Sequence, residues 1–347
     1  MTAYDLEALR PGPTMRAAML TGAGGPETLE VGEFPTPLQV NSEALVRVLA
    51  AGVNPIDAKT RSGKGVAAAI PSYPWVIGGE FAGVVLDAPY ELSPFQPGEE
   101  VFGMVLNPRY SGANAEVVSV PIMSLARKPD SLTMLEAGAV PLAALTAWAA
   151  IIEAGRVRHG MRILVHAGAG GVGHFAVQLG RIYGATVVAT ASARNRDFLL
   201  ELGADEVIDY TKDRFEDVIS EPVDLVVDLI GNVKDDTGSR SIRVLRDGGT
   251  FLSVPTGSFP TMREELEAEG RELVGSHLKC SPDGRALESI AQLIEHGDLR
   301  VEVQEAFPLE RIADAHRTLE EGHVRGKLVL DLGAGSVGAG SLGAGSR

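Results

Sequence analysis

The chain has 347 residues, of which 45% are hydrophobic, so it is long enough for about two domains with buried cores. Its formal net charge of −15, with no basic run to offset it, argues against nucleic acid and anionic membranes as partners. One cysteine, Cys280, excludes an internal disulfide. There is no signal-peptide pattern and no apolar run of membrane-spanning length, so we expect a soluble cytoplasmic protein.

The N-terminal third is rich in short strand patterns. Residues 1 to about 14 form a polar stretch with two prolines, which we expect to be an extension. Beyond it, short apolar runs such as 15–20, 44–50 and 83–87 are separated by glycine and proline. This texture predicts a partly closed antiparallel fold.

A glycine-rich turn follows an alanine-rich helical stretch at 134–152. The apolar run 161–166 ends at the turn, and a helical pattern continues to Tyr183. A strand, a tight turn and a helix are the context in which a G-x-G-x-x-G match indicates dinucleotide binding. Glycine permits positive φ and a close approach to a pyrophosphate, which the helix N-terminus attracts. The residues predicted to bind it are Gly168, Ala169, Gly170, Gly171, Val172 and Gly173.

Further β-rich runs follow at 186–191, 223–230 and 249–254, separated by helical patterns. A chance occurrence of glycines in an ordinary strand-to-helix turn is the alternative interpretation. The regular alternation of strand and helix argues against it, because it is typical of a doubly wound parallel sheet. We therefore predict an α/β protein with a dinucleotide-binding domain.

The C-terminal part falls outside this alternation. Its patterns indicate a helix at 286–295, a strand at 301–306, a helix at 309–321 and a strand at 326–332, which we expect to fold back onto the first domain. A repeated Gly-Ala-Gly-Ser unit then predicts a flexible tail. The predicted organisation is a β-rich domain at 15–131 completed by 280–332, a nucleotide-binding domain at 132–279, and a tail at 333–347.

Several short motifs occur together and in order. On these motifs the chain resembles, over about residues 15–332, the zinc-independent quinone oxidoreductases of the medium-chain dehydrogenase/reductase superfamily, the relatives of ζ-crystallin. Besides the glycine-rich turn, the segments that carry the resemblance are Arg16–Glu27, Gly52–Asp57, Gly78–Gly83, Gly112–Glu116, Pro141–Ala147 and Arg325–Leu330.

The resemblance implies a GroES-like catalytic domain, a Rossmann domain and a cofactor cleft between them. It implies hydride transfer from NADPH to quinones or α,β-unsaturated carbonyls. It also implies a homodimer through edge strands of the Rossmann sheet, near 249–254 and 272–277. The chain departs from the family at two places. Asn114 stands where many members have an aromatic residue, and Lys59 and its neighbours lack tyrosines that some quinone reductases place near the nicotinamide.

Zinc ligands are missing from the first domain. Residues 1–158 contain no cysteine and no histidine, and zinc dehydrogenases need both types there. The positions of their first cysteine and histidine ligands correspond here to Asn54 and Gly79. We predict an enzyme without metal.

The end of the second Rossmann strand predicts the cofactor. NAD-preferring domains have a carboxylate about 20 residues after the motif, and here Thr190 to Ala193 contain none. Arg194 and Arg196 follow, and arginine suits a 2′-phosphate, although both could simply be solvated residues at a helix start. By resemblance, Ser192 and Tyr210 also lie where members bind this phosphate, and Lys327 could add a charge. We predict NADPH.

Four residues are candidates near the nicotinamide. By resemblance Asn54 lines the pocket, where its amide could donate a hydrogen bond to a substrate carbonyl as charge develops. Asp57 is a catalytic candidate or a structural turn residue. Tyr73 is a possible proton donor or part of a plain loop, and Thr146 contacts the nicotinamide or is an ordinary helix residue.

Three functions fit the sequence. The first is an NADPH-dependent oxidoreductase that reduces quinones or α,β-unsaturated carbonyls without zinc, since such substrates need no Lewis acid. The second is an enoyl-thioester reductase of the polyketide type, which shares the fold and the chemistry. The third is a non-catalytic NADPH-binding sensor or structural protein.

Overall fold

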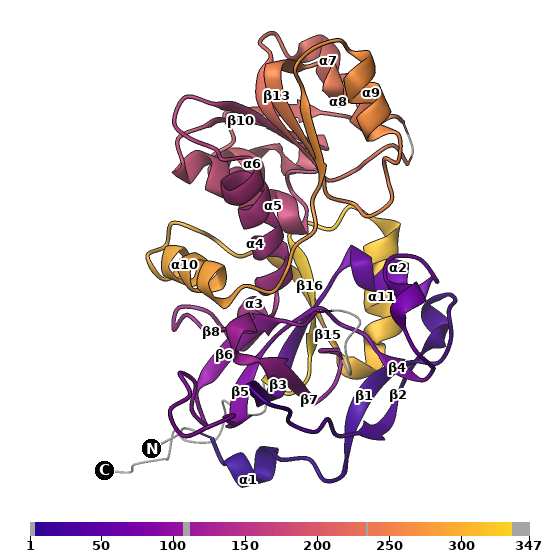
Figure 1. The fold of residues 1–347 in the computed structure, drawn as a ribbon, viewed down its shortest axis with the longest axis vertical. Coiled ribbons are helices and arrows are strands. Elements are labelled where there is room, and N and C mark those ends of the chain that lie inside the picture. The colour runs from indigo at the N-terminus through magenta and orange to yellow at the C-terminus, as the bar shows by residue number, and fades with distance from the viewer. Residues whose placement is uncertain (1–3, 107–111, 234, 335–347) are drawn as a thin grey trace.

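The computed structural model describes residues 4–106, 112–233 and 235–334. A β-rich domain and a parallel-sheet domain are stacked along the long axis of the molecule (Figure 1). None of the helices in these three ranges is long and apolar enough to cross a membrane. Most of the tail predicted from residue 333 onward lies outside the described residues.

The β-rich domain is built on one large sheet with the order β15-β16-β3-β5-β6-β8, in which β7 also pairs with β3. All its pairs are antiparallel except β15 with β16. The last strands of the chain therefore complete the domain that the first strands begin. The strands are β3 (Glu43–Val53), β5 (Glu80–Asp87), β6 (Glu100–Met104), β7 (Val117–Pro121), β8 (Leu125–Arg127), β15 (Val303–Pro308) and β16 (Lys327–Asp331).

A smaller antiparallel sheet of β2, β1 and β4 covers this domain. Its strands are β1 (Thr14–Leu20), β2 (Leu29–Pro35) and β4 (Trp75–Val76), and the neighbouring helices are α2 (Pro55–Arg61) and α11 (Ile312–Glu321). The polar N-terminal stretch is not a free extension, at least from residue 4. It contains α1 (Leu6–Leu9), and Arg10 donates two hydrogen bonds to the carboxylate of Asp87, at 2.6 and 2.7 Å.

The helical stretch predicted at 134–152 is divided into three parts. They are α3 (Met134–Gly138), α4 (Pro141–Trp148) and a π-helix at Ala149–Ala154. Proline at the first position of α4 starts a new helix, because it has no N–H to continue the previous one. The free N–H of Leu142 donates to the Glu80 carboxylate at 2.6 Å, so a side chain from β5 caps α4.

The Rossmann domain has a six-stranded sheet with the order β11-β10-β9-β12-β13-β14, and every pair is parallel. The strand order reverses between β9 and β12, where open α/β sheets bind their ligands. The strands are β9 (Arg162–Val165), β10 (Thr186–Ala191), β11 (Glu206–Asp209), β12 (Val223–Asp228), β13 (Leu245–Ser253) and β14 (Val274–His277). The helices are α5 (Gly171–Ile182), α6 (Arg196–Glu201), α7 (Phe215–Val218), α8 (Thr237–Ile242) and α9 (Met262–Ala268).

One predicted edge strand lies inside this sheet. The segment 249–254 belongs to β13, which is paired on both sides, with β12 and with β14. The prediction that it forms an edge is wrong, because the next strand adds to it in parallel. The segment 272–277 does contain an edge, since all four residues of β14 are exposed.

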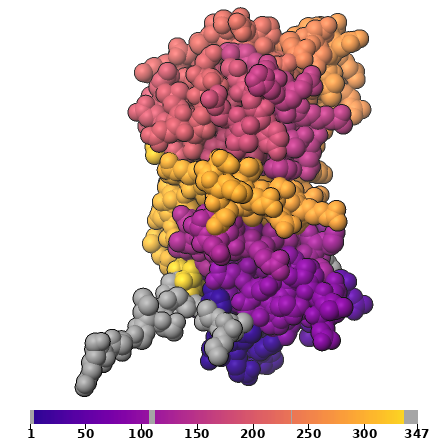
Figure 2. All heavy atoms as spheres, turned by 90° about the vertical axis from the view of Figure 1, so that its left-hand side faces the viewer, coloured from indigo at the N-terminus to yellow at the C-terminus, as the bar shows by residue number. Residues whose placement is uncertain are grey.

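Helix α10 (Gly284–Glu295) lies between the two domains. The turned view in Figure 2 shows this orange-yellow segment as a belt between them. Gly284 lies close to the β8 backbone, where an added Cβ would be 2.4 Å from the Leu125 oxygen. Leu287 and Ile290 are buried in a core cluster that also contains residues of β6 and of the Rossmann strands. One apolar cluster therefore extends through both domains.

Candidate active site at the domain junction

The glycine-rich turn connects β9 to α5 at the carboxyl edge of the sheet. Its positive φ falls on Ala167, at +48°, and on none of the motif glycines. The expectation that the glycines supply positive φ is therefore wrong. They supply space instead: a Cβ on Gly173 would lie 2.2 Å from the Ala167 oxygen, and one on Gly168 would lie 2.9 Å from Ala189 Cβ.

The start of α5 fits the pyrophosphate of a dinucleotide. The helix has twelve residues, begins after Gly170, and has no side-chain cap on its first N–H groups. Uncapped N–H groups and the helix dipole attract phosphate, and the glycines leave its approach free of side chains. The residues predicted for the cofactor turn are thus placed together in the geometry that this ligand needs.

The beginning of β16 lies against this turn. The Gly326 N–H donates to the Ala169 oxygen at 2.8 Å, and a Cβ on Gly171 would be 3.0 Å from Lys327 Cδ. A strand of the catalytic domain therefore touches the cofactor turn of the Rossmann domain. This contact brings the two domains together at the point where a nicotinamide cofactor would lie.

Three side chains form a buried charged cluster beneath this contact. We call Asn54, Glu80 and Lys327 the charged cluster. Lys327 Nζ lies 2.7 Å from Glu80 Oε1 and 2.5 Å from Asn54 Oδ1, and Lys327 is only 3% exposed. A buried ion pair of this kind persists because each charge has a close partner. The prediction that Lys327 contacts the 2′-phosphate is wrong, since its ammonium points into this cluster.

The structure also corrects the prediction for Asn54. Its amide Nδ2 donates to Glu80 Oε1 at 2.8 Å and to the Gly52 oxygen at 3.3 Å, while its Oδ1 accepts from Lys327. Both amide protons are therefore used inside the protein, and the residue is 2% exposed. Asn54 holds the cluster together and has no free proton for a substrate carbonyl.

Asp57 is buried beside the charged cluster. One of its oxygens accepts the Asn54 N–H at 3.0 Å, which makes it a structural cap at the start of α2. Its other oxygen, Oδ1, has no hydrogen-bond partner among the residues that the structure describes. Burial raises the pKa of Asp57 from 3.8 to about 7, although the Asn54 backbone bond and Lys327 act in the opposite direction.

The residues predicted for the 2′-phosphate lie together near the carboxyl ends of β10 and β11. Ser192 directly follows β10 and is half-buried, while Arg194 and Arg196 are exposed. Arg196 is held by a 2.8 Å hydrogen bond to the Val207 oxygen. Tyr210 directly follows β11 and is 50% exposed. The chain therefore gathers exposed polar and positive groups where the adenosine ribose of a dinucleotide would lie.

Arg325 joins this group, and the sequence analysis missed it. Its Nε donates to Asn195 Oδ1 at 3.1 Å, and its guanidinium lies 5.1 Å from the centre of the Phe198 ring. Another of its nitrogens donates to the Arg194 oxygen at 3.4 Å. The available signal was the Arg-Gly-Lys motif that starts at Arg325, in which only the lysine received a role.

Among the described residues, neither Thr146 nor Tyr73 donates a hydrogen bond to the charged cluster. The Thr146 hydroxyl donates to the Leu142 oxygen of its own helix at 2.6 Å. Tyr73 lies in the loop before β4 and is 41% exposed. Among the described residues, no hydrogen bond joins Tyr73 to Asn54 or Asp57. Both roles near the nicotinamide remain predictions.

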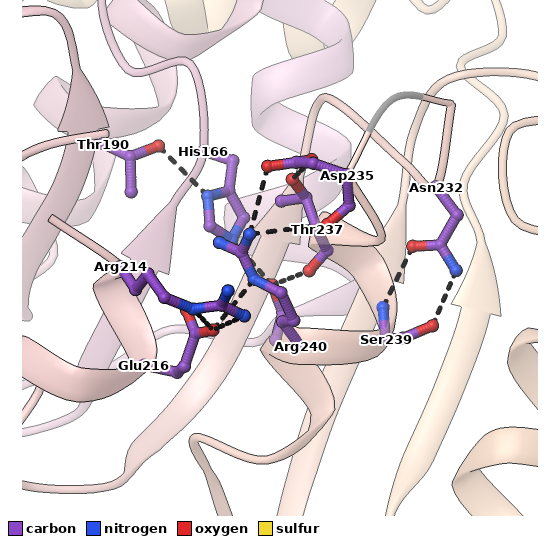
Figure 3. A network of polar contacts seen from close by, with 10 residues as sticks. His166, Thr190, Arg214, Glu216, Asn232, Asp235, Thr237, Ser239 and Arg240 are labelled. Carbon is purple, nitrogen blue, oxygen red and sulfur yellow. Dashed lines mark hydrogen bonds and ion pairs between the residues drawn. The ribbon is translucent and has the colours of Figure 1, made fainter. Parts of the chain in front are cut away.

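A second buried polar group, which carries no net charge, lies next to the turn (Figure 3). We call Thr190, His166 and Ser241 the neutral chain. His166 Nδ1 lies 3.1 Å from the Thr190 hydroxyl, and its Nε2 lies 2.8 Å from the Ser241 hydroxyl. Ser241 donates to the Thr237 oxygen, so His166 carries its proton on Nε2 and donates it to Ser241. Burial, with a contribution from Arg240, lowers the pKa of His166 to about 3, which keeps the ring neutral.

The neutral chain links the turn to α8. Thr190 Oγ1 also accepts the N–H of Ala167, the residue with positive φ, at 3.3 Å. At the other end Ser241 belongs to α8, whose N-terminus is tied to Asn232 through Ser239 (Figure 3). The conformation of the turn is therefore supported from two neighbouring elements.

Glu80 is the second functional residue that sequence reasoning missed. Its carboxylate binds Lys327 and Asn54 with one oxygen and caps α4 with the other. Gly52 makes room for it, because a Cβ there would lie 2.1 Å from Glu80 Oε1. The sequence signal was a glutamate after two glycines, inside a segment that was recognised for its glycines alone.

No group of three or more histidine, cysteine, aspartate or glutamate residues with a metal-binding arrangement occurs in the part of the chain that the structure describes. Burial raises the pKa of the Cys280 thiol to about 12, so it is a poor thiolate ligand. The absence of metal remains a prediction from the sequence.

The chain matches known families and proteins over most of its length. Residues 40–130 match the family described as Alcohol dehydrogenase GroES-like domain, and residues 202–330 match Zinc-binding dehydrogenase. The NADPH-dependent alkenal/one oxidoreductase of Arabidopsis thaliana is 32% identical over 326 residues, covering 91% of this chain and 79% of that protein.

Two solved structures are similar across both domains. The quinone oxidoreductase of Coxiella burnetii has a TM-score of 0.86 and 37% identity, covering 92% of this chain and 99% of that one. The Escherichia coli quinone oxidoreductase in complex with NADPH has a TM-score of 0.80 and 25% identity, covering 91% and 99%. Together the fold, the turn and these relatives define an NAD(P)H-dependent oxidoreductase. The chain belongs to the medium-chain dehydrogenase/reductase superfamily, in the branch of the quinone oxidoreductases.

Proposed function

We propose that this protein transfers a hydride from NADPH to quinones or α,β-unsaturated carbonyls. The observation that carries the proposal is the contact between Gly326 and Ala169, which places the cofactor turn against the catalytic domain. The names of the related alkenal/one and quinone oxidoreductases support this substrate class.

The residues of the chain bind the cofactor and orient it. The turn and the start of α5 would hold the pyrophosphate, and the charged cluster would fix the domain junction around the nicotinamide. When bound, NADPH supplies the hydride, which adds to the electrophilic carbon of the acceptor. The negative charge that then develops on the acceptor oxygen is neutralised by a proton from solvent or from Tyr73, because Asn54 has no free proton to offer and Asp57 is only 1% exposed.

NADPH is favoured over NADH by the positive groups beside β10. Arg194 and Arg325 lie side by side, and neither forms an ion pair within 4.0 Å among the described residues. An arginine without a carboxylate partner is suited to a phosphate, to which it donates charge-assisted hydrogen bonds. Measuring kcat/KM with both cofactors tests this preference, and equal efficiency with NADH would contradict it.

We further propose that the reaction needs no metal. A quinone or enone accepts a hydride without a Lewis acid, whereas alcohol oxidation in related dehydrogenases relies on a zinc-bound alkoxide. The zinc-ligand positions are Asn54 and Gly79, and Asn54 is engaged with Lys327. Stoichiometric zinc in elemental analysis of the purified protein would contradict this proposal.

The central experiment is a substrate screen that follows NADPH absorbance. We expect oxidation of NADPH with naphthoquinone and with short alkenals, and no reduction of NADP⁺ with ethanol or benzyl alcohol. Steady alcohol oxidation without any quinone or enone activity would show that the proposed function is wrong.

A homodimer is proposed through β14. This strand is the last in the Rossmann sheet and all four of its residues are exposed, and such an edge is commonly covered by pairing with another chain. The family resemblance supports a second copy as the partner. Light scattering at micromolar concentration tests the proposal, and a monomer mass would refute it. A cytoplasmic location is proposed from the single cysteine alone.

A further inference from the structure

Lys59 places a positive charge between the two domains. It lies on α2 of the catalytic domain, and its ammonium donates to the Thr256 oxygen of the Rossmann domain at 3.2 Å. Thr256 follows the carboxyl end of β13, at the edge of the sheet where α/β proteins bind ligands. Lys59 is five residues after Asn54, which starts α2, so it lies about 7.5 Å further along the helix.

The charge of Lys59 has no counterion. Among the described residues, no carboxylate lies within 4.0 Å of its ammonium, whose partner is the uncharged oxygen of Thr256. The side chain is partly buried, and burial together with the neighbouring Lys64 lowers the pKa of Lys59. A partly desolvated cation without a counterion is a favourable contact for an anion.

We infer that Lys59 selects electrophilic substrates that carry a carboxylate. The inference rests on the proposed function, since it names a substrate class for the same site. A bound carboxylate accepts a second proton of the ammonium, which keeps its bond to the Thr256 oxygen. A single ammonium suits one monovalent anionic group, and the bond to Thr256 already holds it at the domain junction.

The test compares an aliphatic enone that ends in a carboxylate, two methylenes from the double bond, with its methyl ester. The two probes differ in charge, whereas their double bonds have nearly the same reactivity. In Lys59→Gln, which removes the charge and keeps a donor for Thr256, the acid-to-ester ratio of kcat/KM should fall about tenfold, equal to about 1.4 kcal/mol. Lys59→Arg should keep the ratio within about threefold.

Lys64→Gln is the matched control. Lys64 is exposed and has no ion pair among the described residues, so its charge is screened and the ratio should stay within about twofold of the wild type. In the wild type, rising salt should lower the ratio, and in Lys59→Gln it should not. Melting temperatures of the variants show whether they fold.

An unchanged ratio in Lys59→Gln would overturn the inference. So would an equal loss with acid and ester, because Lys59 would then only hold the domains together. If the wild type reduces neither probe and no quinone, the proposed function itself fails, and that outcome is separate from a selective loss. A ratio that is insensitive to salt in the wild type would also count against a charge-based preference.

Discussion

The two buried polar groups beside the cofactor turn stabilise it by different means. The charged cluster joins Lys327 to Glu80 and Asn54 inside the catalytic domain, beneath the contact with the cofactor turn, whereas the neutral chain of Thr190, His166 and Ser241 lies inside the Rossmann domain. Each member of the neutral chain both donates and accepts in sequence. The charged cluster instead depends on one ammonium and one carboxylate that neutralise each other.

This difference determines what a single substitution leaves behind. Removing a member of the neutral chain leaves an unsatisfied dipole, which costs about 1–3 kcal/mol. Removing one partner of a buried ion pair leaves an isolated charge, which costs about 3–5 kcal/mol. The charged cluster therefore tolerates the loss of one charged partner less well than the neutral chain tolerates the loss of one member. Two measurements test this contrast directly, and two more test the cofactor site beside these groups.

The largest effect is expected for Lys327→Met. It leaves the Glu80 carboxylate buried without its cation, so the free energy of unfolding should fall by about 3–5 kcal/mol in urea titrations. Ser241→Ala, in the neutral chain, should cost less, about 1–3 kcal/mol. Lys212→Met, at an exposed lysine, is the control and should cost about 0.5 kcal/mol or less. Recovery of part of the loss by adding Glu80→Gln is expected, and an equal cost at Lys327 and Ser241 would refute the contrast.

The second-largest effect is expected for Gly173→Ala, because this substitution alters the cofactor turn beside the two groups. The added Cβ would meet the Ala167 oxygen at 2.2 Å, so the backbone of the pyrophosphate site must shift. We expect NADPH affinity to fall about hundredfold in calorimetric titrations, which corresponds to about 2.7 kcal/mol. Gly12→Ala, where a Cβ meets nothing within 4 Å, is the control. Unchanged affinity in Gly173→Ala would show that the turn does not hold the cofactor.

The neutral chain should lose stability in acid. The pKa of His166 is about 3 in the folded protein and about 6.5 when unfolded, so below pH 6.5 the unfolded state binds more protons. Stability should therefore fall as the pH drops from about 6.5 towards 3. At pH 5 the loss attributable to His166 should be about 2 kcal/mol.

His166→Gln tests this expectation, since glutamine does not titrate. Its loss of stability between pH 7 and pH 5 should be about 2 kcal/mol smaller than that of the wild type in urea titrations. His159→Gln, at an exposed histidine, is the control and should follow the wild type. Identical pH dependence in His166→Gln and the wild type would show that the ring is not held neutral.

The smallest effect is expected outside both groups, at Arg325. Arg325→Gln removes one positive charge beside Arg194, so the preference for NADPH over NADH should fall about tenfold, or about 1.4 kcal/mol. Steady-state kcat/KM with each cofactor measures it. Arg285→Gln, at an exposed arginine of α10, should change nothing. If Arg325→Gln keeps the full preference, the 2′-phosphate is bound elsewhere.

Patterns within short stretches of the sequence predicted the class of fold. The α/β class was confirmed, and the glycine-rich turn lies between β9 and α5 as expected. These features depend on periodicity and on residues that are close in sequence, so the sequence alone is enough to recognise them. The same local evidence missed β11, which has only four residues.

Contacts between distant segments decided the roles of individual residues. Lys327 and Asn54 are 273 positions apart, and nothing in either segment shows that they meet. Only the tertiary structure turns Lys327 away from the 2′-phosphate and puts Arg325 beside Arg194. The placement of positive φ on Ala167, where a motif of glycines suggested otherwise, is likewise a result of packing.

By itself, then, the sequence determined the superfamily, the position of the cofactor turn and the lack of cysteine and histidine at the usual zinc positions, because each depends on residue identity in a local pattern. The tertiary structure alone decided which charges are buried together and which remain without a counterion at the domain junction. The physical reason is that a charge acts through its distance to other charges and to water, and those distances exist only once distant segments of the chain have packed together.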